Sequence, residues 1–101
     1  MIDKIDIYEA KTFKERLFGL MFKKNINYGL LFKNCNSIHT FFMKENIDVV
    51  MTDKNNKVIY IKKNMKKNRI ILPKKNVYKT YEFPANFIKN LKVNDKLKTR
   101  I

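Results

Sequence analysis

The chain has 101 residues, of which 45 % are hydrophobic, and its formal net charge at pH 7 is +14. This length fits one domain over residues 1–101, and the apolar content excludes a disordered tail. The single cysteine excludes an internal disulfide, and no apolar run approaches the roughly 20 residues that a membrane-spanning helix needs.

The first third of the chain predicts a strand, a short helix and a second strand. Charged and apolar residues alternate over Ile2–Ala10, which favours a strand. Thr12 and Glu15 match a capping box, so we expect a short helix over Phe13–Leu20. The apolar run Gly29–Phe32 indicates a buried strand.

The middle of the chain predicts three more strands. Ser37–Met43 is rich in β-branched and aromatic residues, which favour extended structure. Asp48–Thr52 and Val58–Ile61 flank the turn Asp53–Asn56 and form the clearest hairpin. We expect a basic loop over Lys62–Lys67.

The last third predicts strands over Arg69–Leu72, Val77–Phe83 and Lys96–Arg100, with a second short helix beginning at Pro84-Ala85-Asn86-Phe87-Ile88. Strands dominate, and they do not alternate regularly with helices, so a doubly wound parallel sheet is not expected. The predicted fold class is mainly β: a small, mostly antiparallel barrel or curled sheet with two short helices.

Reactive residue types are densest between Cys35 and Asp48. Cys35, His39 and Met43 offer soft metal ligands, but residues four apart on a strand are separated by about 13 Å. Because the ligands of one zinc ion lie only a few Å apart, we expect no metal and no cofactor here.

Two other interpretations of this segment remain. Cys35 or Ser37 would be a nucleophile with His39 as base and Asp48 orienting it, but there is one histidine and no Gly-x-Ser-x-Gly turn. Alternatively, the segment serves recognition. On a continuous strand His39, Phe41 and Met43 share one face, which would line a groove for a peptide or a small apolar ligand, unless both faces are simply buried.

Arg16 and Glu82 are the remaining charged candidates. Arg16, on the first helix, would clamp an anionic ligand or a carboxylate such as Asp48 or Glu82. We favour an internal ion pair that fixes the helix on the sheet, and we expect a basic neighbour beside Glu82.

Several linked motifs lie in a fixed order along the chain: Arg16–Phe22, Gly29–Phe32, Cys35–Met43, Ile47–Asp53, Tyr81–Asn86 and Asn94–Asp95. Together they resemble the family catalogued as domain of unknown function 192, from about Ala10 to Leu97. The resemblance implies a small β-barrel-like domain and supplies no activity. Asn86 and Asn94 replace the family's usual glycines, and asparagine tolerates the left-handed backbone that such turns need. By position, the family's characteristic residues would be Arg16, Gly19, Leu20, Met21, His39, Thr40, Phe41, Met43, Asp48 and Glu82.

The charge pattern does not single out a polyanion partner. Lysine, asparagine and isoleucine make up 45 of the 101 residues, as in the products of an A/T-rich genome, and only three of the 23 basic residues are arginine. We therefore favour a lysine-rich solvated surface, with a nucleic-acid-binding β-barrel as the alternative.

These observations predict a non-enzymatic binding or assembly module, linked to envelope secretion or pilus machinery, with a hydrolase-like enzyme as a second alternative. Its partner would be a protein or a small apolar or anionic ligand. The first residues lack the apolar segment of a signal peptide, so a cytoplasmic, bacterial protein is expected. The candidate binding residues are Arg16, Met21, His39, Phe41, Met43, Asp48 and Glu82.

Overall fold

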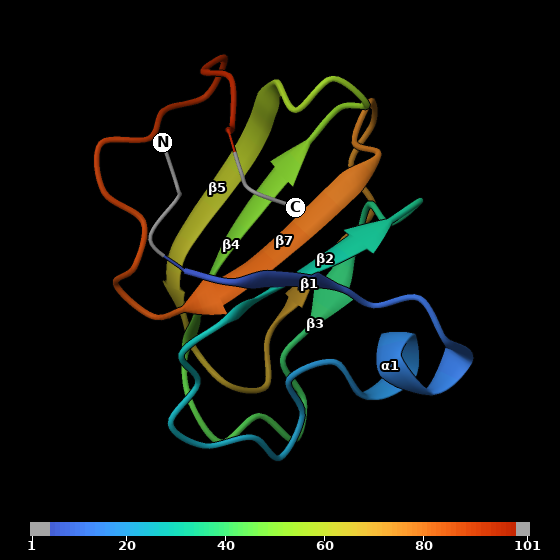
Figure 1. Cartoon of the computed structure of the whole chain (residues 1–101), viewed down its shortest axis with the longest axis vertical. Coiled ribbons are helices and arrows are strands. Elements are labelled where there is room, and N and C mark those ends of the chain that lie inside the picture. Colours follow the sequence, from blue (N-terminus) through green and yellow to red (C-terminus); the bar gives the residue numbers. More distant parts are fainter. Residues whose placement is uncertain (1–4, 99–101) are drawn as a thin grey trace.

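The computed structural model describes residues 5–98 and is mainly β. Figure 1 shows the main sheet running across the molecule, with α1, the one helix among residues 5–98, at the lower right and the C-terminal segment at the upper left. The elements are β1 (Ile7–Glu9), α1 (Phe13–Phe18), β2 (Gly29–Lys33), β3 (Ile38–His39), β4 (Ile47–Thr52), β5 (Val58–Met65), β6 (Ile70–Ile71) and β7 (Lys79–Pro84).

The main sheet has the order β1-β2-β7-β4-β5, and β3 pairs with β6 in a separate two-stranded sheet. β1 runs parallel to β2, while every other pair of the main sheet is antiparallel. The described strands therefore form an open mixed sheet with β1 and β5 at its edges, so of the two expected forms, a barrel or a curled sheet, the closed barrel is not formed.

Each face of the main sheet carries its own core. Side chains of β7 alternate, so Tyr81 and Phe83 point to one face and Glu82 points to the other. The first core contains Leu31, Val50, Val58, Tyr81, Phe83, Ile88 and Leu97. The second core contains Leu20, Ile26, Met43, Ile47, Val49, Met51, Met65 and Ile71. The side chain of Glu82 therefore lies on the same face of the sheet as the apolar residues of the second core.

The strand expected over Ser37–Met43 is wrong beyond His39. The buried Thr40 hydroxyl accepts a hydrogen bond from Arg69 N at 2.8 Å and donates one to Lys66 O at 2.7 Å. Phe42 then turns the chain with a φ of 63°. These contacts with a distant loop override the local preference for extended structure.

The second helix, expected from Pro84, is also wrong. β7 continues to Pro84, and Asn86 follows in a left-handed conformation with a φ of 65°. The buried Asp48 carboxylate accepts the N–H groups of Asn86 and Ile88, so the Ile88 N–H does not bond to Pro84 O as a helix from Pro84 would require.

The boundaries of other predicted elements also differ from those in the structure. β5 runs to Met65 and covers Lys62–Met65, the first two thirds of the expected basic loop. The last expected strand is reduced to one bridge between Lys57 and Lys96, and its final residues, like the first ones of the expected N-terminal strand, lie outside the described residues. No helix within residues 5–98 is long and apolar enough to cross a membrane.

Local sequence signals were confirmed where the interactions are local. Thr12 Oγ1 accepts from Glu15 N and Glu15 Oε1 accepts from Thr12 N, both at 3.0 Å, which completes the predicted capping box. β4 and β5 form the predicted hairpin. Asn86 and Asn94 both have positive φ, as expected for residues in glycine positions.

Candidate functional site

A small pocket lies on the second-core face of the sheet, where the end of α1 meets β2, β3 and β7. Its volume is about 120 Å³, and we call it the Glu82 pocket. Its lining residues are Arg16, Leu17, Phe18, Gly19, Leu20, Met21, Phe32, Cys35, Ser37, Ile38, His39, Met43 and Glu82. Five of the seven predicted binding residues are among them.

Glu82 carries the only carboxyl group among the lining residues. It lies between Leu30 of β2 and Val49 of β4 in the register, and only 7 % of its surface is exposed. Among residues 5–98 it has neither a hydrogen-bond partner nor an ion pair; Arg16 lines the same pocket but does not pair with it, so the expected pairing with a basic neighbour is not made. No fully enclosed polar side-chain atom in this part of the chain lacks a partner, so the Glu82 oxygens keep access to the pocket. Burial raises the pKa of Glu82 to about 7.

Gly19 brings the end of α1 against this carboxyl. It caps the helix with a φ of 49°, and its N–H donates to Glu15 O at 2.8 Å. A Cβ at this position would lie 3.1 Å from Phe32 Cζ and 3.7 Å from Glu82 Oε1. A glycine is therefore required both by the backbone conformation and by the close approach to the pocket.

His39 and Met43 line the pocket, but the proposed strand face with Phe41 does not exist. Because β3 ends at His39, a turn separates these residues, and Phe41 is exposed and lies outside the lining. Its ring stacks on His39 with centroids 5.1 Å apart, and Phe41 N donates to His39 Nδ1 at 3.2 Å. Phe41 therefore orients the imidazole from outside the pocket.

Cys35 and Ser37 also line the pocket, yet neither is paired with the histidine. Cys35 Sγ donates to Ser37 O at 3.2 Å, and within residues 5–98 no hydrogen bond joins either side chain to His39. The turn after β3 also brings Cys35, His39 and Met43 to one cavity, which a continuous strand would prevent. Even so, no three His, Cys, Asp or Glu side chains in the described part of the chain group closely enough to hold a metal ion.

Arg16 and Asp48 do not make the contacts that were predicted for them. Arg16 lies at the pocket but forms no ion pair within residues 5–98, so the predicted internal pair is wrong. Asp48 points to the opposite face of the sheet, where it accepts the N–H groups of Asn64, Asn86 and Ile88 at 2.7, 3.1 and 2.9 Å. This carboxylate organises loops and is not part of the pocket.

The apolar wall of the pocket was not among the predicted binding residues. Phe18, Leu20, Phe32 and Ile38 supply it, from α1 and its end, β2 and β3. The sequence assigns such residues to helix and strand interiors, and nothing in a periodic apolar pattern separates a pocket wall from an ordinary core.

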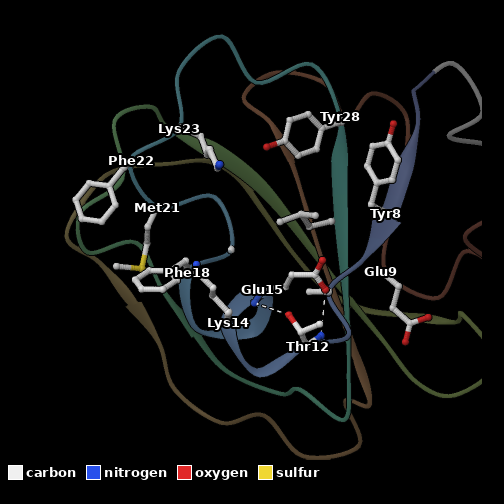
Figure 2. A pocket seen from close by; sticks show the side chains of 13 residues that line it. Tyr8, Glu9, Thr12, Lys14, Glu15, Phe18, Met21, Phe22, Lys23 and Tyr28 are labelled. Carbon is white, nitrogen blue, oxygen red and sulfur yellow. Dashed lines mark hydrogen bonds between the residues drawn. The ribbon is translucent and has the colours of Figure 1, made fainter.

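A larger, shallower groove of about 920 Å³ lies between β1 and α1. Figure 2 shows Phe18, Met21 and Phe22 on one side of this groove and Tyr8 and Tyr28 on the other. It holds two carboxylates, of which Glu15 belongs to the capping box and Glu9 pairs with Lys33 at 3.6 Å.

Comparison with known proteins identifies relatives over nearly the whole chain. A model of the DUF192 family, described as Uncharacterized ACR, matches residues 2–99. UPF0127 protein PH1112 from Pyrococcus horikoshii is 37 % identical over 97 residues, which cover 88 % of this chain and 83 % of that protein. UPF0127 protein TK1120 from Thermococcus kodakarensis is 38 % identical over 92 residues, covering 85 % of this chain and 58 % of that protein.

The chain spans 58–62 % of the length of three Thermococcus relatives that it matches. These relatives are archaeal, so they do not confirm the expected bacterial origin.

Solved structures support the fold. A protein of unknown function from Novosphingobium aromaticivorans superposes with a TM-score of 0.70 at 16 % identity, over 81 % of this chain and 64 % of that chain. A protein from Sinorhizobium meliloti gives a TM-score of 0.73 at 18 % identity, over 89 % and 76 % of the two chains. At these identities the likeness concerns the fold alone.

Proposed function

The chain belongs to the DUF192 family, and we propose that it is a non-enzymatic binding module whose site is the Glu82 pocket. The observation that carries this proposal is Glu82, a residue only 7 % exposed whose carboxyl group has no partner among residues 5–98 and lines the cavity. A buried polar group without a hydrogen bond costs free energy. A ligand that supplies the missing donor recovers that free energy.

The chemistry of the pocket favours a compact cation on an apolar stem, above all a primary ammonium group. The walls at Leu20, Phe32 and Met43 are apolar and suit an alkyl chain, while Glu82 supplies the acceptor. The volume of about 120 Å³ admits the end of an alkylamine and excludes a nucleotide-sized cofactor. An apolar ligand with a hydrogen-bond donor also fits. An anion would be attracted by the exposed Arg16 but repelled by the more deeply buried Glu82 carboxylate.

A lysine side chain of a partner protein presents the same chemistry. Its four-carbon stem buries readily while its ammonium group keeps three hydrogen-bond donors. In that form the module would act in protein assembly, and the secretion or pilus machinery expected from the sequence would be one setting for it.

The test is a titration of the protein with n-butylammonium, followed by amide chemical shifts at about pH 8, where Glu82 is mostly ionised. We expect saturable shifts at Gly19, Met21 and Met43. Glu82→Gln should weaken binding about tenfold or more, because it removes the charge and replaces one acceptor oxygen by a donor. Binding to the unaltered protein should also weaken at about pH 5.5, where Glu82 is protonated.

Two controls make the result specific. Glu9→Gln removes a carboxylate that already pairs with Lys33 on the surface, and it should leave the affinity unchanged. Butyrate has the same stem with the opposite charge and should not bind. Equal affinity of Glu82→Gln and the unaltered protein, or equal binding of butyrate, would refute the proposal.

A further inference from the structure

Two phenylalanines occupy backbone conformations that, within residues 5–98, are otherwise adopted by asparagine and Gly19. Eleven non-glycine residues within residues 5–98 have a positive φ, and nine of them are asparagine. The other two are Phe22, with a φ of 65°, and Phe42, with a φ of 63°. A bulky side chain is disfavoured in this region, and such strain persists only where the surroundings or the function require it.

The two strained residues are neighbours in space. Their ring centroids lie 5.8 Å apart, and Phe22 N donates to Phe42 O at 3.0 Å, which ties two loops together. The rings nevertheless contribute little to the core, because Phe22 is 56 % and Phe42 is 62 % exposed. The strain therefore does not serve the packing of the fold.

The pair belongs to a wider apolar surface. Met21 N donates to Phe18 O at 2.7 Å, and Phe18, Met21 and Phe22 lie together along one side of the groove (Figure 2). α1 itself has no buried residue, and its apolar side chains Phe13, Leu17 and Phe18 are all exposed. We call Phe18, Phe22 and Phe42 the aromatic tip.

Exposed lysines lie close to the phenylalanines of the aromatic tip in the sequence, and Lys14 and Lys23 line the groove together with Phe18 and Phe22. These lysines have no ion pair within residues 5–98, where the single ion pair is Lys33 with Glu9. The nearby carboxylates are engaged by backbone groups: Glu15 accepts from Lys11 N and Thr12 N, and Glu45 accepts from Asn25 N and Ile26 N. The lysines are Lys11, Lys14, Lys23, Lys24 and Lys44.

We propose that the aromatic tip inserts into an anionic lipid surface, with these lysines on the headgroups. Exposed apolar rings flanked by lysines are complementary to the boundary between acyl chains and negatively charged headgroups. Loop residues at positive φ project the rings outward, and the backbone bond between Phe22 and Phe42 holds them in place before binding.

A lipid surface fits these residues better than a single-stranded nucleic acid does. The adjoining groove holds the carboxylates Glu9 and Glu15, which would repel a phosphate backbone that followed it. Lysine also acts on headgroups as a simple point charge, and Arg16 is the one arginine, the type preferred for base contacts, on α1 and its adjoining loops, against Lys11, Lys14, Lys23 and Lys24.

The test is binding of the protein to vesicles of phosphatidylcholine with about 30 % phosphatidylglycerol, compared with phosphatidylcholine alone. We expect binding to the anionic vesicles and at least about tenfold weaker binding to the neutral ones. The double variant Phe22→Asn with Phe42→Asn should lose about tenfold or more of the affinity for anionic vesicles. Its thermal midpoint should be unchanged or higher, because asparagine accepts a positive φ, so loss of binding cannot be attributed to unfolding.

Val93→Asn is the matched control, since Val93 is also about half exposed but lies in the C-terminal segment, away from α1 (Figure 1). It should bind vesicles like the unaltered protein. No binding to anionic vesicles, or full binding by the double variant, would overturn the proposal. Binding to a single-stranded oligonucleotide that depends on Phe22 and Phe42, without vesicle binding, would assign the tip to nucleic acid instead.

Discussion

Two buried carboxyl groups from adjacent strands of one sheet behave in opposite ways. Asp48 of β4 is fully buried and accepts three backbone N–H groups, while Glu82 of β7 is nearly as buried and accepts none among the described residues. They point to opposite faces, because Asp48 lies opposite Phe83 and Glu82 lies opposite Val49 in the register. Burial therefore does not separate a structural carboxyl group from a binding one, whereas the presence or absence of hydrogen-bond donors does.

The largest expected effect tests the structural side of this contrast. Asp48→Ala should lower the free energy of unfolding by at least about 3 kcal/mol, because it leaves the N–H groups of Asn64, Asn86 and Ile88 without their acceptor. Urea denaturation at neutral pH measures the loss. Asp53→Ala is the control, since its carboxylate also accepts two N–H groups, from Asn55 and Lys57, but at an exposed turn, so a smaller loss is expected. Equal losses for the two variants would contradict the structural role of Asp48.

The same contrast explains which features the sequence could predict. The capping box of Thr12 and Glu15 and the β4–β5 hairpin depend on residues close in sequence, and both were confirmed. The failed strand after His39 depends on Thr40 meeting Arg69 across 29 residues, and the failed second helix depends on Asp48 capturing Ile88 across 40. Local sequence patterns do not predict such long-range contacts.

The same division between local and long-range contacts applies to the Glu82 pocket. The motifs that resemble the DUF192 family identified Glu82, His39 and Met43, which the fold does bring to one pocket. Whether a carboxyl group is paired, however, depends on every chain segment around it. Sequence patterns therefore could not predict that, within residues 5–98, Arg16 is unpaired and Glu82 lacks a donor while Asp48 has three.

The binding side of the contrast predicts a specific dependence of stability on pH. The pKa of Glu82 is about 7 in the folded protein against an ordinary value of 4.5, so the folded state holds this proton more tightly. The free energy of unfolding from this group is therefore greatest below about pH 4.5 and is lost as the pH rises through about 7, by up to about 3 kcal/mol. Urea denaturation at several pH values measures this loss.

Glu82→Gln isolates the contribution of Glu82 to the pH dependence of stability, because the other titrating groups remain. The difference in stability between the two proteins should change between about pH 4.5 and 7 and stay level above that range. A difference that is independent of pH would mean that Glu82 is paired in solution, and the contrast with Asp48 would then fail.

The smallest expected effect concerns the distance between α1 and Glu82. Gly19→Ala should cost about 1–2 kcal/mol, because the φ of 49° disfavours an L residue and the new Cβ would lie 3.1 Å from Phe32 Cζ. The added methyl group, 3.7 Å from Glu82 Oε1, also excludes water from the carboxyl group and should raise its pKa further. Thr12→Ala provides the comparison: it removes the cap of the same helix at a cost of about 1 kcal/mol without touching the pocket. A carboxyl-detected NMR titration should therefore show a higher midpoint for Glu82 in Gly19→Ala and an unchanged one in Thr12→Ala. Equal midpoints would mean that the end of α1 does not set the environment of this carboxyl group, and the difference between Glu82 and Asp48 would then arise within the sheet itself.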